Sequence, residues 1–139
     1  MMGAQIAACH AIGVRAPIYF TVGWSANDAK RHPGWRAKMK DGRDSTWKFD
    51  VDAGPEEPLP ANAWIDLCPS GDYRELMLRQ VREICGKYPV DGMFFDICNP
   101  KPCFCRYCRA GMWKAGLEPE SDAHERVYCT SKWASFITA

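Results

Sequence analysis

Hydrophobic residues fall into two short continuous runs, each next to a stretch with helical spacing. Residues 14–23 are rich in β-branched and aromatic side chains, which favours a buried strand. Residues 93–97 are apolar except for Asp96, which favours a second strand, buried on both faces of a parallel sheet. Residues 4–12 suit a helix that Gly13 would end in a left-handed conformation.

The clearest helix precedes the second strand. Its apolar positions recur at helical spacing and comprise Tyr73, Met77, Val81 and Ile84. Asp72 and Glu75 fit a capping box at its start. Gly86 predicts a left-handed C-terminal residue, and Pro89 prevents the helix from continuing.

Two more helices are expected after the second strand. Residues 106–115 form a short helix that stops at Gly116, and a last helix opens near Asp122, with Glu125 as its capping partner. Strands that alternate with helices predict an α/β fold with a parallel sheet. Two parallel strands do not make a stable sheet alone. We therefore interpret residues 1–139 as a fragment of one domain, about half of a TIM (β/α)8 barrel with long βα loops.

Composition and charge argue against several classes of binding partner. The formal net charge is +1, with no block of one sign, so nucleic acid and acidic membranes are not expected as partners. No apolar run has the ~18 residues that a membrane-spanning helix needs. The first eight residues lack the basic and apolar regions of a signal peptide, which favours a cytoplasmic protein.

The cysteine pattern indicates a metal site. Four of the eight cysteines lie within residues 98–108, and three of them, Cys103, Cys105 and Cys108, form a C-x-C-x-x-C motif. Clustered thiols in a reducing compartment favour structural Zn²⁺ held by four sulfurs. Cys98 is the nearest fourth ligand, and Cys68 is the other candidate. An iron–sulfur cluster and incidental free thiols are the alternatives.

Asp96 is the candidate catalytic residue. It closes the second strand, and chemistry in parallel α/β folds gathers where strands end. A carboxylate there can attack an anomeric carbon. The alternative is a structural role, in which the side chain caps the following loop.

The polar stretch of residues 24–63 is long enough to be a functional loop. Its Trp24, His32 and Trp35 are candidate substrate-binding residues, because indole faces stack on sugars and imidazole binds hydroxyls. The alternative is that its tryptophans, Trp47 included, only pack the loop against the domain.

Residues 91–96 (D-G-M-F-F-D) and 103–108 (C-F-C-R-Y-C) together resemble a known pattern. The chain is similar to the (β/α)8-barrel proteins described as hypothetical glycosyl hydrolases, relatives of the α-amylase, α-L-fucosidase and β-galactosidase barrels. Residues 22–24, 32–35 and 64–69 add to the likeness.

That resemblance implies retaining hydrolysis of glycosidic bonds, with a carbohydrate substrate and with Asp96 as the nucleophile at the end of barrel strand 4. Zinc-carrying β-galactosidase barrels take their fourth cysteine from an earlier loop, which implies Cys68 rather than Cys98. Those enzymes have an Asn-Glu pair where this chain has Asp96 and Ile97, so their mechanism does not transfer. The general acid/base is expected on a later strand, so residues 1–139 alone are expected to be inactive.

A function of another class remains open. A zinc-stabilised module could bind carbohydrate or protein through its aromatic loop without catalysis. A thiol redox protein is a weaker alternative, because it needs an exposed cysteine with a low pKa.

Overall fold

The computed structural model describes residues 1–47 and 64–139. In chain order the elements are α1 (Met2–Ala11), β1 (Ile18–Thr21), α2 (Ala26–Arg31), the 3-10 helix η1 (Pro33–Trp35), β2 (Thr46–Trp47), β3 (Trp64–Ile65), α3 (Gly71–Lys87), β4 (Met93–Asp96), α4 (Arg106–Lys114) and α5 (Asp122–Ile137). The alternation of strands and helices that the sequence predicts is confirmed, although both predicted strands are shorter than their apolar runs.

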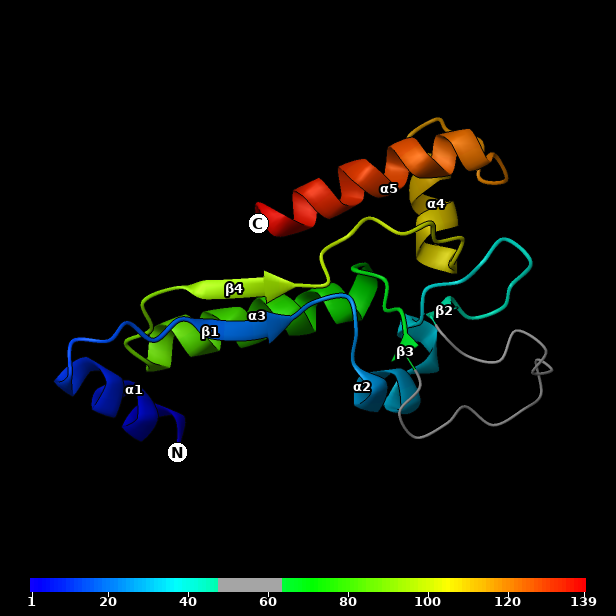
Figure 1. Cartoon of the computed structure of the whole chain (residues 1–139). Helices are drawn as coiled ribbons and strands as arrows, with labels where there is room; N and C mark the ends of the chain where they lie inside the picture. Colours follow the sequence, from blue (N-terminus) through cyan, green and yellow to red (C-terminus); the bar gives the residue numbers. More distant parts are fainter. Residues whose placement is uncertain (48–63) are drawn as a thin grey trace.

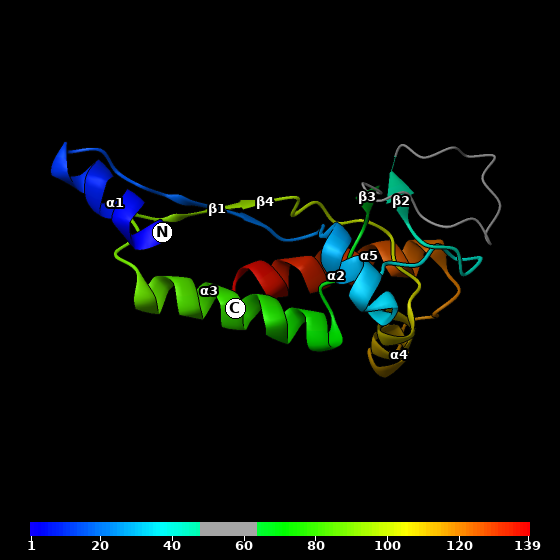
Figure 2. The same cartoon turned by 90° about the horizontal axis from the view of Figure 1, so that it is seen from below.

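β1 and β4 form a parallel pair (Figure 1). The register places Ile18 beside Met93 and Thr21 beside Asp96. The chain crosses from one strand to the other through α3, which lies along one face of the pair (Figure 2). The parallel sheet and its helical crossover are therefore as predicted.

The buried core lies just past the end of β1, where residues of α2, β3, α3 and α5 pack together. Tyr73 and Met77 of α3 pack with Val22, which follows β1, and with Trp133 of α5. The hydroxyl of Tyr73 donates a hydrogen bond to the backbone carbonyl of Val22. A buried hydroxyl is thereby satisfied, and the start of α3 is joined to the end of β1.

The other face of the sheet is open. Tyr19 of β1 is 57% exposed, and Phe94 of β4 is 58% exposed. The prediction that the second strand is buried on both faces is wrong, because Phe94 and its neighbour Phe95 are both exposed. The described residues contain one parallel pair rather than half of an eight-stranded barrel, and the barrel stays a prediction. No helix among the described residues is both long and apolar enough to cross a bilayer.

The segment after β1 is ordered by short elements. Ser25 caps α2, and its side chain accepts a hydrogen bond from the Asp28 backbone nitrogen. β2 and β3 pair antiparallel, with Trp47 beside Trp64. The tryptophan-bearing loop is therefore structured up to Trp47, whereas residues 48–63 lie outside the described part.

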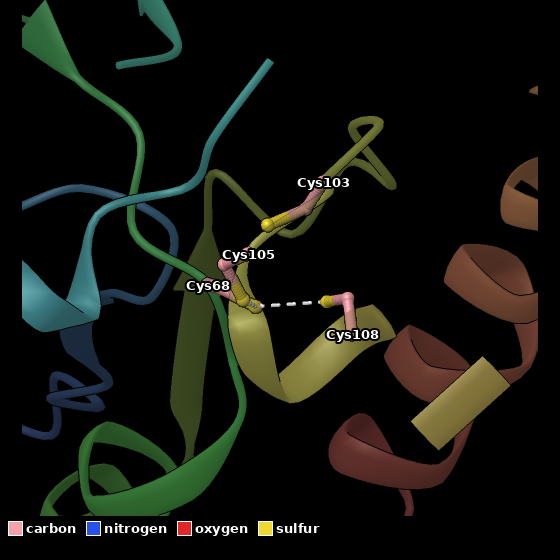
Figure 3. A group of neighbouring side chains, drawn as sticks. All are labelled: Cys68, Cys103, Cys105 and Cys108. Carbon is pink, nitrogen blue, oxygen red and sulfur yellow. Dashed lines mark hydrogen bonds between the residues drawn. The ribbon is translucent and has the colours of Figure 1, made fainter. Parts of the chain in front are cut away.

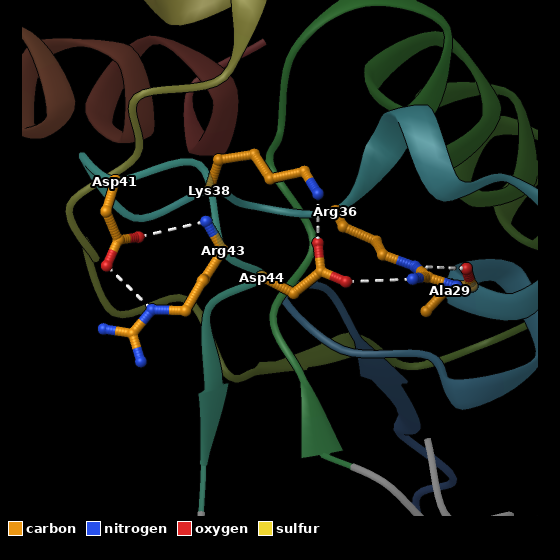
Figure 4. Close-up of polar contacts among 6 residues, drawn as sticks. All are labelled: Ala29, Arg36, Lys38, Asp41, Arg43 and Asp44. Atoms are coloured by element: carbon orange, nitrogen blue, oxygen red, sulfur yellow. Dashed lines mark hydrogen bonds and ion pairs between the residues drawn. The ribbon is translucent and has the colours of Figure 1, made fainter. Parts of the chain in front are cut away.

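Ionic contacts brace this segment (Figure 4). Arg36 donates from Nε to the Ala29 carbonyl at 2.8 Å and from Nη1 to Asp44 Oδ2 at 2.9 Å. Asp44 also pairs with Lys38. The Lys38 carbonyl in turn accepts from the Phe104 backbone nitrogen at 2.8 Å, so the braced segment holds the chain that carries the cysteine motif.

Two predicted helix boundaries are wrong. α3 begins at Gly71 with Ser70 as its N-cap, so Asp72 lies inside the helix and the capping box does not form. Gly86 stays helical, and α3 ends at Lys87, with Tyr88 as its C-cap in an extended conformation. Proline disfavours helical geometry in the residue before it, and Pro89 therefore sets this boundary without a left-handed glycine.

The start of α5 also differs. Ser121 is the N-cap, and its hydroxyl accepts a hydrogen bond from the His124 backbone nitrogen. Asp122 is the first helical residue, and Glu125 is buried against another segment instead of capping the helix. The left-handed glycine predicted after α1 is confirmed, with a φ of 73° at Gly13. The predicted stop of α4 at Gly116 is also confirmed, and this glycine has a φ of 72°.

Candidate functional site

Four buried cysteine sulfurs meet at one point (Figure 3). Cys68 comes from the segment before α3, Cys103 and Cys105 from the loop after β4, and Cys108 from the first turn of α4. All four sulfurs lie within 4.8 Å of one another. The structure thus brings together the four residues that the sequence analysis named as metal ligands.

The spacing of the sulfurs suits a tetrahedral metal ion. Sulfurs bound at ~2.3 Å to one ion would be about 3.8 Å apart. The Cys68 sulfur lies 3.5 Å from that of Cys108 and 3.8 Å from that of Cys105. The other candidate, Cys98, points its thiol to the Asp96 carbonyl at 3.7 Å and is not in the cluster.

Backbone contacts fix Cys68. Its nitrogen donates to the Trp35 carbonyl at 2.9 Å, and the preceding Leu67 nitrogen donates to the Gly23 carbonyl, also at 2.9 Å. The first of these partners belongs to η1 and the second to the chain just after β1. A cysteine distant in sequence is therefore positioned by the end of the parallel sheet.

A cation lies beside the sulfurs. Lys132 Nζ on α5 is 3.1 Å from Cys108 Sγ and 3.5 Å from Cys68 Sγ. Burial lowers the pKa of Lys132, but the thiolates of Cys68, Cys108 and Cys103 together raise it, and the net pKa is raised. This lysine was not among the predicted site residues, because α4 and the loop after it separate α5 from the cysteine motif.

The thiols influence one another strongly. The pKa of Cys68 is lowered, chiefly by its contact with the sulfur of Cys103. The pKa of Cys108 is raised, chiefly by contacts with Cys103 and Cys105. Negative charge on the other sulfurs thus opposes ionisation of Cys108. A bound cation would remove that effect.

Glu125 also contacts the cluster, although its sequence position predicted a role as a helix cap. Its side chain is 1% exposed, and Oε1 accepts from the Cys103 backbone nitrogen at 2.8 Å. One turn further along α5, the Cys129 thiol donates to the Lys101 carbonyl at 2.8 Å. Glu125, Cys129 and Lys132 have i, i+4, i+7 spacing, a one-face pattern that could have drawn attention to them.

The carboxylate of Asp96 lies at the end of β4, on the open face of the sheet. Tyr19 donates from its hydroxyl to Asp96 Oδ2 at 2.5 Å, and the Ile97 nitrogen donates to Oδ1 at 2.8 Å. The hydrogen bond from Tyr19 and then that from Ile97 hold the pKa of Asp96 below its usual value. The site therefore offers an ionised carboxylate, and Tyr19 is a partner that the sequence did not reveal.

The three aromatic candidates pack against other rings. Trp24 stacks on Trp64 with centroids 4.8 Å apart. His32 stacks on Trp35 at 3.8 Å, and Trp35 lies against Tyr73 of α3 at 5.5 Å. These contacts agree with a packing role, and the sugar-binding role remains a prediction.

A partly buried ion pair lies beside the cysteine cluster. Asp66 accepts from Lys101 Nζ at 2.5 Å and from the Ser45 hydroxyl at 2.7 Å. Beside it is a cavity of about 10 Å³, whose lining includes Cys68 and Lys132. That volume has room for about one water molecule at most, so this cavity is too small for a substrate.

Comparison with known proteins places the chain among glycosyl hydrolases. The solved structure of α-L-fucosidase isoenzyme 2 from Paenibacillus thiaminolyticus matches with a TM-score of 0.82 and 31% identity. The match covers 99% of this chain but only 19% of that one. A search of curated proteins found no match. The family model for hypothetical glycosyl hydrolase 6 (GHL6) matches residues 1–97, and the chain therefore belongs to that family.

Proposed function

We propose that residues 1–139 form two neighbouring βα units of a glycoside hydrolase barrel, in which Asp96 is the nucleophile of a retaining reaction. The observation that carries the proposal is the ionised carboxylate of Asp96, which ends a parallel strand and is aligned by Tyr19. Membership of the GHL6 family supports a glycosidic bond as the target.

The open face of the sheet supports the barrel. Tyr19 and Phe94 are large, exposed rings on neighbouring strands, with centroids 5.8 Å apart. In a closed barrel, side chains of neighbouring strands would cover them. The chain spans 19% of the matched fucosidase chain, which leaves ample length for the remaining strands.

In the proposed reaction an Asp96 oxygen attacks the anomeric carbon of a sugar and forms a glycosyl ester as the bond to the leaving group breaks. A second carboxylic acid, about 5 Å away in retaining enzymes, would protonate the leaving oxygen and then activate water to cleave the ester. Residues 1–139 alone are proposed to be inactive, because that acid lies on a later strand.

Trp24 is the best placed of the proposed sugar contacts. β1 ends at Thr21, which pairs with Asp96, and Trp24 follows three residues later. Its indole lies parallel to that of Trp64, and such a flat surface suits the apolar face of a sugar. His32 and Trp35, whose rings stack on each other, are the other proposed sugar contacts.

The test uses the full-length protein and a panel of aryl glycosides that includes an α-L-fucoside. We expect Asp96→Asn to lower kcat by ~10⁴-fold, the order seen when a group that takes part in covalent chemistry is lost. Azide should restore turnover in Asp96→Gly and give a glycosyl azide of inverted configuration. Asp91→Asn, just before β4, is the matched control and should keep its activity. Full activity in Asp96→Asn would overturn the assignment.

We further propose that the four-cysteine cluster holds structural Zn²⁺. Four thiolates complete a tetrahedron and leave no position for substrate or water, so the ion would stabilise the loop after β4 and take no part in hydrolysis. All eight cysteines are free thiols, which suits a reducing cytoplasmic location.

Metal content measured on cysteine variants tests this site. We expect one zinc per wild-type chain, a loss of bound zinc in Cys68→Ser, and full occupancy in Cys98→Ser. Cys85→Ser removes an exposed thiol outside the cluster and serves as the control. Equal zinc in Cys68→Ser and the wild type would contradict the ligand set.

A further inference from the structure

The buried polar face of α5 meets the cysteine cluster at three points. Glu125 accepts a hydrogen bond from the Cys103 backbone, Cys129 donates to the Lys101 carbonyl, and Lys132 lies against two sulfurs. Residues at i, i+4 and i+7 project from the same side of a helix. α5 therefore contacts the cluster with functional groups as well as with apolar packing.

The contacts of Lys132 differ from an ordinary surface ion pair. Its Nζ approaches Cys108 Sγ at 3.1 Å and Cys68 Sγ at 3.5 Å, and these sulfurs come from segments 40 residues apart. Within the described residues the ammonium has no carboxylate partner in an ion pair. The charged groups that raise its pKa are the thiolates of the cluster, those of Cys68 and Cys108 first.

Charge explains why a lysine belongs at this position. A divalent ion with four thiolates carries a net charge of −2. Burying that charge is unfavourable unless a nearby cation and hydrogen bonds compensate it. The four sulfurs are buried and Lys132 is half-buried, so water compensates the charge only weakly there.

We propose that Lys132 is a positioning residue of the metal centre: its ammonium donates to Cys68 and Cys108, offsets the thiolate charge and fastens α5 to the loaded site. This inference rests on the proposed zinc site. It adds α5 to the parts of the chain that hold the site, beside those that supply the ligands.

The main experiment measures Zn²⁺ affinity by competition with a chromophoric chelator. We expect Lys132→Gln to weaken binding about 10–100-fold, the usual effect of losing a residue that supports metal ligands. Lys132→Arg keeps the charge and should stay close to the wild type. Arg126→Gln removes one charge from an exposed position of the same helix and is the matched control.

The outcomes separate this inference from the zinc site itself. If the wild-type chain binds no Zn²⁺, the zinc site fails and the role of Lys132 fails with it. If the wild type binds one Zn²⁺ and Lys132→Gln binds it equally well, only the role of Lys132 is overturned. Equal weakening in Arg126→Gln would likewise overturn it, because the effect would then be one of general charge.

A measurement on the wild type covers the case in which Lys132→Gln does not fold. Acetic anhydride labelling, read by mass spectrometry, compares zinc-loaded and chelator-treated protein. We expect Lys132 to be shielded in the loaded protein and labelled after chelation, whereas exposed Lys114 reacts equally in both. Equal labelling of Lys132 in the two states would overturn the proposal.

Discussion

The Tyr19 hydroxyl and Asp96 Oδ2 lie 2.5 Å apart across the parallel strands β1 and β4. This hydrogen bond is the first cause of the lowered pKa of Asp96, because it stabilises the charged form of the carboxylate. Tyr19 and Asp96 lie on the same face of the sheet, since residues two apart on a strand share a face and Thr21 pairs with Asp96.

We expect Tyr19→Phe to raise the pKa of Asp96 towards 3.8, the ordinary value. A lowered pKa in the folded state gives stability that is present above the unfolded-state pKa and is lost as the pH falls through the folded-state value. The variant should therefore lose the contribution of Asp96 at a higher pH. A carboxyl NMR titration measures the shift, with Tyr88→Phe as the control. An unchanged Asp96 pKa in Tyr19→Phe would rule out this role.

Metal removal should lower stability. An ion that binds only the folded chain stabilises it by about 2.7 kcal/mol at a concentration a hundred times its Kd. We therefore expect a chelator to lower the Tm of the wild type and to have little effect on Cys103→Ser. Differential scanning calorimetry with and without chelator checks this. Identical Tm shifts in the two proteins would indicate that the chelator acts elsewhere.

Gly23 should tolerate no side chain. A Cβ there would overlap the backbone carbonyl oxygen of Ile97 and lie 3.4 Å from the Trp133 ring. Ile97 is itself held at a φ of 57°, and its backbone cannot yield easily. We expect Gly23→Ala to cost about 1–3 kcal/mol in the free energy of unfolding. Gly86→Ala, with open space around it in α3, should be neutral or stabilising in the same urea titration.

Tyr73 should contribute through its hydroxyl as well as its ring. Tyr73→Phe keeps the ring but leaves the buried Val22 carbonyl without this donor. We expect a loss of about 1–3 kcal/mol in the free energy of unfolding, measured by chemical denaturation. Tyr88→Phe provides a reference from a half-buried tyrosine. Equal stability of Tyr73→Phe and the wild type would show that the hydrogen bond has no net value.

The sequence predicts the local elements well because their signals are local. Apolar spacing marks α3, and the run at residues 93–97 marks β4. The predicted N-cap of α3 was wrong because Ser70 is the N-cap and the helix begins at Gly71, which places Asp72 inside the helix. A capping motif identifies residues able to cap, and the chain path decides which of them does.

The site is harder to predict because its parts are distant in the chain. Asp96 and three clustered cysteines stand out in the sequence. The spacing of the cysteines left both Cys68 and Cys98 as candidates for the fourth ligand, and only the family resemblance favoured Cys68. The contacts of Lys132 with the sulfurs depend on how α5 packs, and the one-face spacing of Glu125, Cys129 and Lys132 does not say which segment that face meets. Glu125 has the spacing of a capping residue but is a buried hydrogen-bond acceptor, because tertiary packing places it against the Cys103 backbone.

The distance along the chain between Cys68 and Cys108 has a further consequence. These residues are 40 positions apart, and the chain between them contains α3 and β4. An ion that stays bound to both while the chain unfolds would act as a cross-link and close that stretch into a ring. Ring closure of this length removes about 4 kcal/mol of conformational freedom from the unfolded chain in the disulfide model. A metal bridge here would therefore keep the two ends of the stretch that contains α3 and β4 together in the unfolded chain. Refolding would then begin with Cys68 and Cys108 already close to each other.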